Sequence, residues 1–157
     1  MRLPEDTARS WLGKADGEGD PFDRFVSLWF ALNALYNEFF DRSERAAIGD
    51  FLYSGHHSMG EDAELAILGS GPARYFTERV IRDCRGWGTD TREDATILAS
   101  SERMPTRRVK SLLMILYQVR CNLFHGNKVY ARESDEEVVA HAADALGAIL
   151  RACLGDA

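Results

Sequence analysis

Cysteine is scarce in this chain. Cys84, Cys121 and Cys153 are the three cysteines among 157 residues, an odd number at wide spacing. A disulfide framework needs cysteines in pairs, and a zinc site needs ligands a few residues apart. The three cysteines match neither pattern, and unpaired cysteines are typical of proteins in a reducing compartment. We therefore expect a cytoplasmic protein with no metal site and no cofactor.

Long apolar segments are also missing. The longest runs, residues 26–36 and 111–119, are interrupted by Asn33 and Gln118. Both are far shorter than the roughly 20 residues that cross a bilayer. The first residues turn acidic at once and lead into no apolar stretch, so we expect no signal peptide. The sequence predicts a protein without a membrane partner.

No segment alternates apolar and polar residues over the length of a useful strand. Apolar residues recur instead at three- and four-residue steps, most clearly over about Pro21 to Phe40 and about Thr106 to Phe124. We therefore predict an all-α bundle in which these two long helices run antiparallel, with shorter helices around them. No repeat or linker divides residues 1–157, which are expected to form one domain.

Shorter stretches of helical periodicity predict the peripheral elements. They lie at about residues 43–52, 61–68, 72–84 and 92–99, and a last helix follows Ser134. In the segment 72–84 we expect Val80 and Ile81 to point inward. The three tryptophans, Trp11, Trp29 and Trp87, are expected in the core or in an interface rather than as stacking platforms for bases.

Acidic residues are absent from one window of an otherwise acidic chain. Between Arg103 and Arg132 there are seven Lys or Arg and no Asp or Glu. The whole chain carries −6, so setting these seven charges aside leaves −13 on the remaining residues. A local excess of positive charge attracts anions to that part of the surface. Two interpretations stay open. The cations of this window bind phosphate, or they simply lie on the solvent-exposed face of a helix.

Within this window lies the run Val119-Arg120-Cys121-Asn122-Leu123-Phe124-His125-Gly126-Asn127-Lys128. Arginine binds phosphate through two N–H groups, and histidine exchanges a proton near neutral pH. On a regular helix Arg120 and His125 would lie roughly 140° apart. They can meet if the helix ends near Phe124, as Gly126 suggests, or if two chains pair. The alternative is that Arg120 is a surface ion-pair partner and His125 part of a helix cap.

The run from residue 117 to residue 128, Tyr117-Gln118-Val119-Arg120-Cys121-Asn122-Leu123-Phe124-His125-Gly126-Asn127-Lys128, resembles the closing motif of HEPN domains, a family of small all-α bundles. Residues 25–36, Phe-Val-Ser-Leu-Trp-Phe-Ala-Leu-Asn-Ala-Leu-Tyr, are similar to the first long helix of uncharacterised bacterial HEPN-like proteins. In this family Arg-x4-6-His marks metal-independent endoribonucleases that act as dimers. Many members have a polar residue directly after the arginine. Here that position is Cys121, and the polar residue is Asn122.

The resemblance implies an endoribonuclease in which Arg120 holds the phosphate and His125 handles protons. Such an enzyme would use the 2′-hydroxyl as nucleophile and leave a 2′,3′-cyclic phosphate. It implies a homodimer, RNA as substrate, and a toxin with a nucleotidyltransferase-like antitoxin or a phage-defence component. We expect the catalytic pair at a solvent-facing helix end, where it contributes little to the core.

Three further residues are candidates for binding the substrate: Asn33, Asn122 and Lys128. Asn33 is equally compatible with a buried amide bonded to the backbone, and Lys128 with a solvated loop. A second function also fits the same residues. The chain would then be a non-catalytic helical module that uses the basic window to bind RNA, a nucleotide or an acidic protein.

Overall fold

A computed structural model describes residues 3–101, 103–125 and 133–156, with the side chains of residues 133 and 134 excepted. Within these residues the protein is all-helical and contains no β-strand, only one isolated bridge between Arg82 and Asp90. The prediction of an all-α fold is therefore confirmed. No helix in the described part of the chain has the length and apolar character needed to cross a membrane.

The described residues form the following helices in chain order. Their bounds are α1 Pro4–Asp16, α2 Pro21–Tyr36 with a 3-10 turn at Asn37–Phe39, α3 Glu44–Ser54, α4 Glu61–Leu68, α5 Gly71–Thr77, α6 Arg92–Ala99, α7 Pro105–Phe124 and α8 Glu133–Cys153.

Local sequence signals fix where several of these helices begin. The Asp20 side chain accepts a hydrogen bond from the backbone N–H of Phe22 at 2.8 Å. Pro21 occupies the first helical position of α2, where its missing N–H costs nothing. Ser43 caps α3 in a similar way by accepting from Ala46 N–H at 3.1 Å. Gly55 ends α3 at φ 75°, a left-handed conformation that favours glycine.

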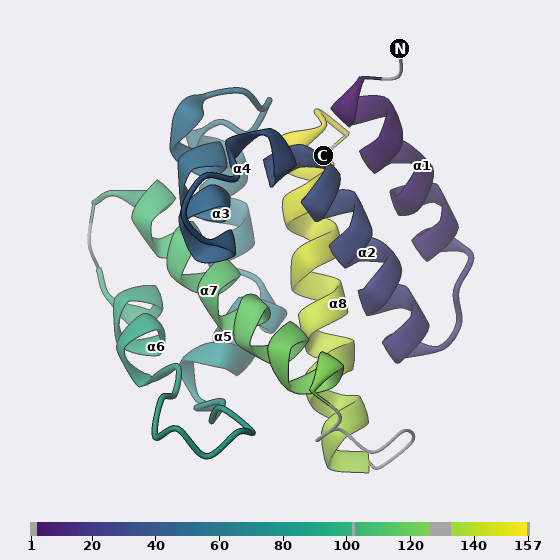
Figure 1. The fold of residues 1–157 in the computed structure, drawn as a ribbon. Coiled ribbons are helices and arrows are strands. Elements are labelled where there is room, and N and C mark those ends of the chain that lie inside the picture. The colour runs from purple at the N-terminus through teal and green to yellow at the C-terminus, as the bar shows by residue number, and fades with distance from the viewer. Residues whose placement is uncertain (1–2, 102, 126–132, 157) are drawn as a thin grey trace.

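The helices pack in two groups around one core (Figure 1). On one side α2 packs between α1 and α8, and on the other α7 packs against α3, α4 and α6. Helices α7 and α8 also touch each other, which joins the groups. Trp29, Leu32, Leu112, Leu116 and Leu146 are among the fully buried side chains. Burial of this apolar surface is the main force that holds the helices together.

The segment after Pro72 departs from its prediction. Helix α5 ends at Thr77 rather than near Cys84, and Val80 is exposed rather than inward. The reason is a local exchange of hydrogen bonds: Ile81 N–H donates to Thr91 Oγ1 at 2.8 Å, and Thr91 N–H donates to Ile81 O at 3.0 Å. These bonds give the backbone of Ile81 and Thr91 hydrogen-bonding partners outside a helix. Ile81 itself is buried, as expected.

Helix α1 is an element that the sequence did not predict. Its buried face consists of Ala8, Leu12 and Ala15, which is sparse and mostly small. Such a face produces little apolar periodicity. The helix is nevertheless packed along α2, where Trp11 meets Phe30 with ring centroids 4.8 Å apart.

Candidate functional site

The candidate site lies at the C-terminal end of α7. The helix ends at Phe124, as the sequence predicted, and His125 follows as its cap with φ −89° and ψ 10°. The His125 backbone N–H still donates to Cys121 O at 3.0 Å. Its side chain is exposed, and the imidazole has no hydrogen-bonding partner among the residues that the structure describes. His125 is thus presented to solvent by the last turn of a rigid helix.

Arg120 is held far more tightly than a surface arginine. Its guanidinium carbon lies 5.8 Å from the ring centroids of both Trp29 and Tyr117 and 4.7 Å from that of Phe124. Arg120 Nη1 donates to Glu44 Oε2 at 3.1 Å. Only 23% of the side chain is exposed. A guanidinium that is stacked on aromatic rings and paired with a carboxylate has lost most of its freedom to rotate, so its donors point in fixed directions.

The donors of Arg120 are unevenly used. Nη1 bonds Glu44 and lies 4.0 Å from the Cys121 sulfur, whereas the buried Nε has no hydrogen-bonding partner among the residues that the structure describes. Among the described residues Nη2 has no partner either. A buried donor without a partner costs free energy, which native proteins mostly avoid. Arg120 therefore retains capacity to bind an additional acceptor through Nη2.

Tyr36 and Glu44 form the support of this arginine. The Tyr36 hydroxyl donates to Glu44 Oε1, leaving Oε2 for Arg120. Burial, and then the hydrogen bond to Glu44, raise the pKa of the Tyr36 hydroxyl well above its usual value, while a hydrogen bond from the Asn33 side chain acts in the opposite direction. Asn33, the remaining candidate for binding substrate, is half-buried and lines a separate pocket with Thr7, Trp11 and Phe30.

This support predicts an alkaline loss of stability. A tyrosine whose pKa is raised in the folded state stays protonated there, while in the unfolded chain it ionises near pH 10. The stabilisation is therefore fully present below about pH 10 and is lost as the pH rises above it. We expect the free energy of unfolding in urea to fall as the pH rises from about 10 to about 12, and to fall less in Tyr36→Phe. Equal slopes in both proteins would contradict this role of Tyr36.

The structure places Asn122 away from the site. This residue is buried, and its side-chain oxygen accepts from Cys84 N–H at 3.0 Å and from Gln118 Nε2 at 2.9 Å. Its side-chain nitrogen donates to Arg82 O at 2.8 Å. The bonds to Cys84 and Arg82 tie α7 to the segment after α5. We therefore assign Asn122 a structural role in place of the predicted contact with substrate, and Lys128, the other candidate on this side, lies outside the described residues.

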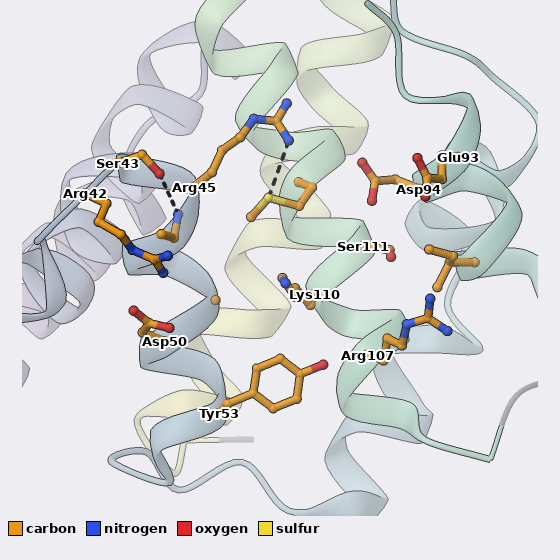
Figure 2. Close-up of a pocket in the computed structure, with 14 residues that line it drawn as sticks. Arg42, Ser43, Arg45, Asp50, Tyr53, Glu93, Asp94, Arg107, Lys110 and Ser111 are labelled. Carbon is orange, nitrogen blue, oxygen red and sulfur yellow. Dashed lines mark hydrogen bonds between the residues drawn. The ribbon is translucent and has the colours of Figure 1, made fainter.

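A cavity of about 650 Å³ opens beside the same helix, between α3, α6 and the first half of α7 (Figure 2). The cavity is lined by four cationic side chains and three carboxylates. The cations are Arg42, Arg45, Arg107 and Lys110, and the carboxylates are Asp50, Glu93 and Asp94. The stem of Lys110 crosses α3 at Gly49, where an added Cβ would lie 3.1 Å from Lys110 Cε. Glycine at this position lets the ammonium reach the cavity, 5.8 Å from the centre of the Tyr53 ring.

A second cavity of about 380 Å³ adjoins the first and shares Arg45, Glu93 and Asp94 with it. Arg45 lies over the Tyr117 ring at 5.1 Å and approaches the Met114 sulfur at 3.7 Å. Burial raises the pKa of the Asp94 carboxyl, an effect that Arg45 opposes. The second cavity continues to Tyr117 and Cys121, both of which contact the Arg120 guanidinium. We call the two adjoining cavities the polar groove; Arg120 itself lines neither of them.

Sequence reasoning missed the acidic and aromatic partners of Arg120. Glu44 lies 76 positions before it in the chain, and nothing in the sequence connects the two. Trp29, in contrast, was expected in the core or in an interface and is buried in the core. In the described part of the chain, no cluster of three or more His, Cys, Asp or Glu side chains is arranged to hold a metal ion.

Comparison of this chain with protein-family models, with curated proteins and with solved structures finds no match.

Proposed function

We propose that this protein is a metal-independent endoribonuclease of the HEPN type, with Arg120 and His125 as its catalytic pair. The observation that carries the proposal is the fixed guanidinium of Arg120, which keeps a donor available five positions before an exposed histidine at a helix end. The same proposal includes a HEPN-like arrangement in which α2 and α7 are the two long antiparallel helices.

The chemistry requires three things: removal of the 2′-hydroxyl proton, in-line attack on phosphorus, and stabilisation of charge on the non-bridging oxygens. His125 is accessible and is of the residue type that accepts a proton near neutral pH. Arg120 supplies a positive charge whose position is set before the substrate arrives, which is the condition under which electrostatic stabilisation is most effective. His125 takes the 2′-hydroxyl proton, the 2′-oxygen bonds to phosphorus while the bond to the 5′-oxygen breaks, and the leaving 5′-oxygen takes up a proton from water.

The groove beside α7 offers the RNA backbone cationic contacts along the same helix that carries this pair. Arg42, Arg45 and Lys110 line it, and none of them forms an ion pair with a carboxylate within the described residues. Cations without carboxylate partners are the groups that contact phosphates, and DNA would bind there without being cleaved because it lacks the 2′-hydroxyl.

A direct assay tests the proposal. Purified protein incubated with mixed single-stranded RNA in EDTA should generate fragments, while single-stranded DNA of the same sequence should remain intact. Intact RNA over a range of protein concentrations, or fragments that appear only with added divalent metal, would overturn the metal-independent mechanism.

We further propose that the active form is a two-fold homodimer with both Arg120–His125 pairs along one groove. Two-fold pairs are the commonest soluble oligomers and bring the same patch together from both chains. Phe124 is exposed beside Arg120 and offers an apolar contact near the axis. Light scattering should therefore give about twice the chain mass of 17.6 kDa at micromolar concentration. A monomer that still cleaves RNA would mean that one chain builds the site alone.

One observation favours a different function, a non-catalytic binding module. Glu44 pairs with Arg120 in this structure, so an RNA phosphate must share or displace that carboxylate. A module of this kind would bind RNA with an affinity that falls steeply with salt and would release no product. Binding without cleavage by the parent protein would therefore favour this second function. In either case the cellular role, as a toxin paired with a nucleotidyltransferase-like antitoxin or as a phage-defence factor, remains a proposal that rests on the HEPN resemblance.

A further inference from the structure

The segment between α5 and α6 presents an exposed tryptophan on a narrow loop. Trp87 is 69% exposed, the most among the large apolar residues that the structure describes. It lies between Gly86 at φ 73° and Gly88 at φ 78°, and glycine adopts this left-handed conformation without steric cost. Below the tip, Asp83 N–H donates to Thr89 O at 2.9 Å, so the loop is closed at its base. Trp87 therefore does not lie in the core, and its other expected place, an interface, stays a prediction.

The Trp87 ring is backed by an immobilised cation. The guanidinium carbon of Arg85 lies 3.8 Å from its ring centroid. Arg85 in turn bonds the buried Asp83 twice, from Nε to Oδ1 at 3.0 Å and from Nη2 to Oδ2 at 2.7 Å. Arg85 also holds the pKa of the Asp83 carboxyl well below its usual range, so this ion pair persists over the physiological pH range. The Arg85 guanidinium on which the indole rests is thereby fixed by the buried Asp83 carboxylate.

The 380 Å³ cavity described above lies between this loop and α7. It is lined by Trp87 and Arg85 from the loop and by Tyr117 and Cys121 from α7. The carboxylates of Asp90, Glu93 and Asp94 also line it. The volume falls in the range of small-molecule sites. Two of the residues that line this cavity, Tyr117 and Cys121, also contact the Arg120 guanidinium, although Arg120 itself does not line it.

We propose that this cavity binds one nucleobase of the RNA, stacked on Trp87, beside the phosphate that Arg120 holds. The inference rests on the proposed function, since it takes RNA as the substrate. An aromatic face backed by arginine is the usual platform for an unpaired base. The carboxylates add a preference, because they accept hydrogen bonds and can pair only with N–H groups on the base edge. Guanine presents two adjacent donors, N1–H and the 2-amino group, whereas uracil presents one N–H.

Binding is measured with the His125→Ala protein in EDTA, so that the RNA stays intact. Fluorescence anisotropy of a labelled single-stranded oligonucleotide gives the dissociation constant for a guanine-containing sequence and for oligouridine. We expect the guanine-containing sequence to bind more tightly, and Trp87→Ala to weaken its binding about tenfold. Trp87→Phe keeps a stacking surface and should lose no more than about threefold.

Phe40→Ala is the matched control, because Phe40 is also a highly exposed aromatic residue but lines none of this cavity. It should bind as the parent does. Affinity within twofold of the parent for Trp87→Ala, or equal loss in Trp87→Ala and Phe40→Ala, would overturn the base platform. If the protein with His125 intact cleaves RNA in EDTA while Trp87→Ala binds RNA normally, the base platform is overturned and the proposed ribonuclease function stands. If the protein neither binds RNA at low salt nor cleaves it, the base platform and the proposed function are both overturned.

Discussion

Replacing His125 with alanine should reduce RNA cleavage by about 10²–10⁴-fold, the range expected when a general acid–base group is removed. The melting temperature should stay within about 1 °C of the parent, because the side chain is exposed and the structure describes no partner that it would lose. Cleavage is followed on a labelled single-stranded RNA in EDTA, and melting by circular dichroism.

His56→Ala is the matched control for this variant. His56 is likewise an exposed histidine, but it follows α3 and does not lie at the end of α7 that carries Arg120. It should cleave at the parent rate. A His125→Ala protein that cleaves normally would remove His125 from the site. One that unfolds would instead assign His125 to the helix cap.

Asn122→Ala should cost about 2–4 kcal/mol of unfolding free energy, the largest stability effect we expect near the site. The amide makes three hydrogen bonds in a buried position, and alanine makes none of them. The change leaves Cys84 N–H, Gln118 Nε2 and Arg82 O to find new partners, and each buried polar group left without one costs about 1–3 kcal/mol. Urea unfolding followed by circular dichroism measures the difference.

The variant Asn122→Asp distinguishes the hydrogen bonds that the Asn122 side chain accepts from the one that it donates. The carboxylate keeps the acceptor for Cys84 N–H and Gln118 Nε2 but cannot donate to Arg82 O, and it buries a charge. We expect it to be destabilised as well. A loss in Asn122→Ala no larger than that of an ordinary surface substitution, about 0.5 kcal/mol, would show that the bonds to the 82–84 segment are dispensable. It would also reopen the assignment of Asn122 to substrate.

The long elements could be predicted from the sequence because their signals are local. Asp20-Pro21 and Ser43 mark helix starts by interactions within three residues, and sustained three- and four-residue periodicity marked α7 up to Phe124. Helix α1 gave little such signal because its buried face consists mostly of alanine. The shortened α5 depends on a hydrogen bond between Ile81 and Thr91, ten residues apart, which periodicity does not report.

The candidate site was predictable only in part. The Arg120 and His125 side chains were identified, but the environment of Arg120 was not. We expected a solvent-facing pair with little effect on stability, whereas Arg120 is mostly buried and is paired with Glu44 from a distant helix. Arg120→Ala should therefore lower the melting temperature as well as abolish cleavage. Asn122 carries a polar side chain in the motif, and only the tertiary structure reveals that it points to the 82–84 segment.

The measurement that tests the account most directly is the chemistry of the RNA ends. A defined oligoribonucleotide is digested in EDTA, and its fragments are weighed by mass spectrometry, with a second substrate that carries a single 2′-deoxy nucleotide at the mapped cleavage position. We predict a 2′,3′-cyclic phosphate on one fragment, a 5′-hydroxyl on the other, and no cleavage at the deoxy position. Fragments with a 5′-phosphate and a 3′-hydroxyl, or equal cleavage at the deoxy position, would contradict attack by the 2′-hydroxyl and the roles given to Arg120 and His125.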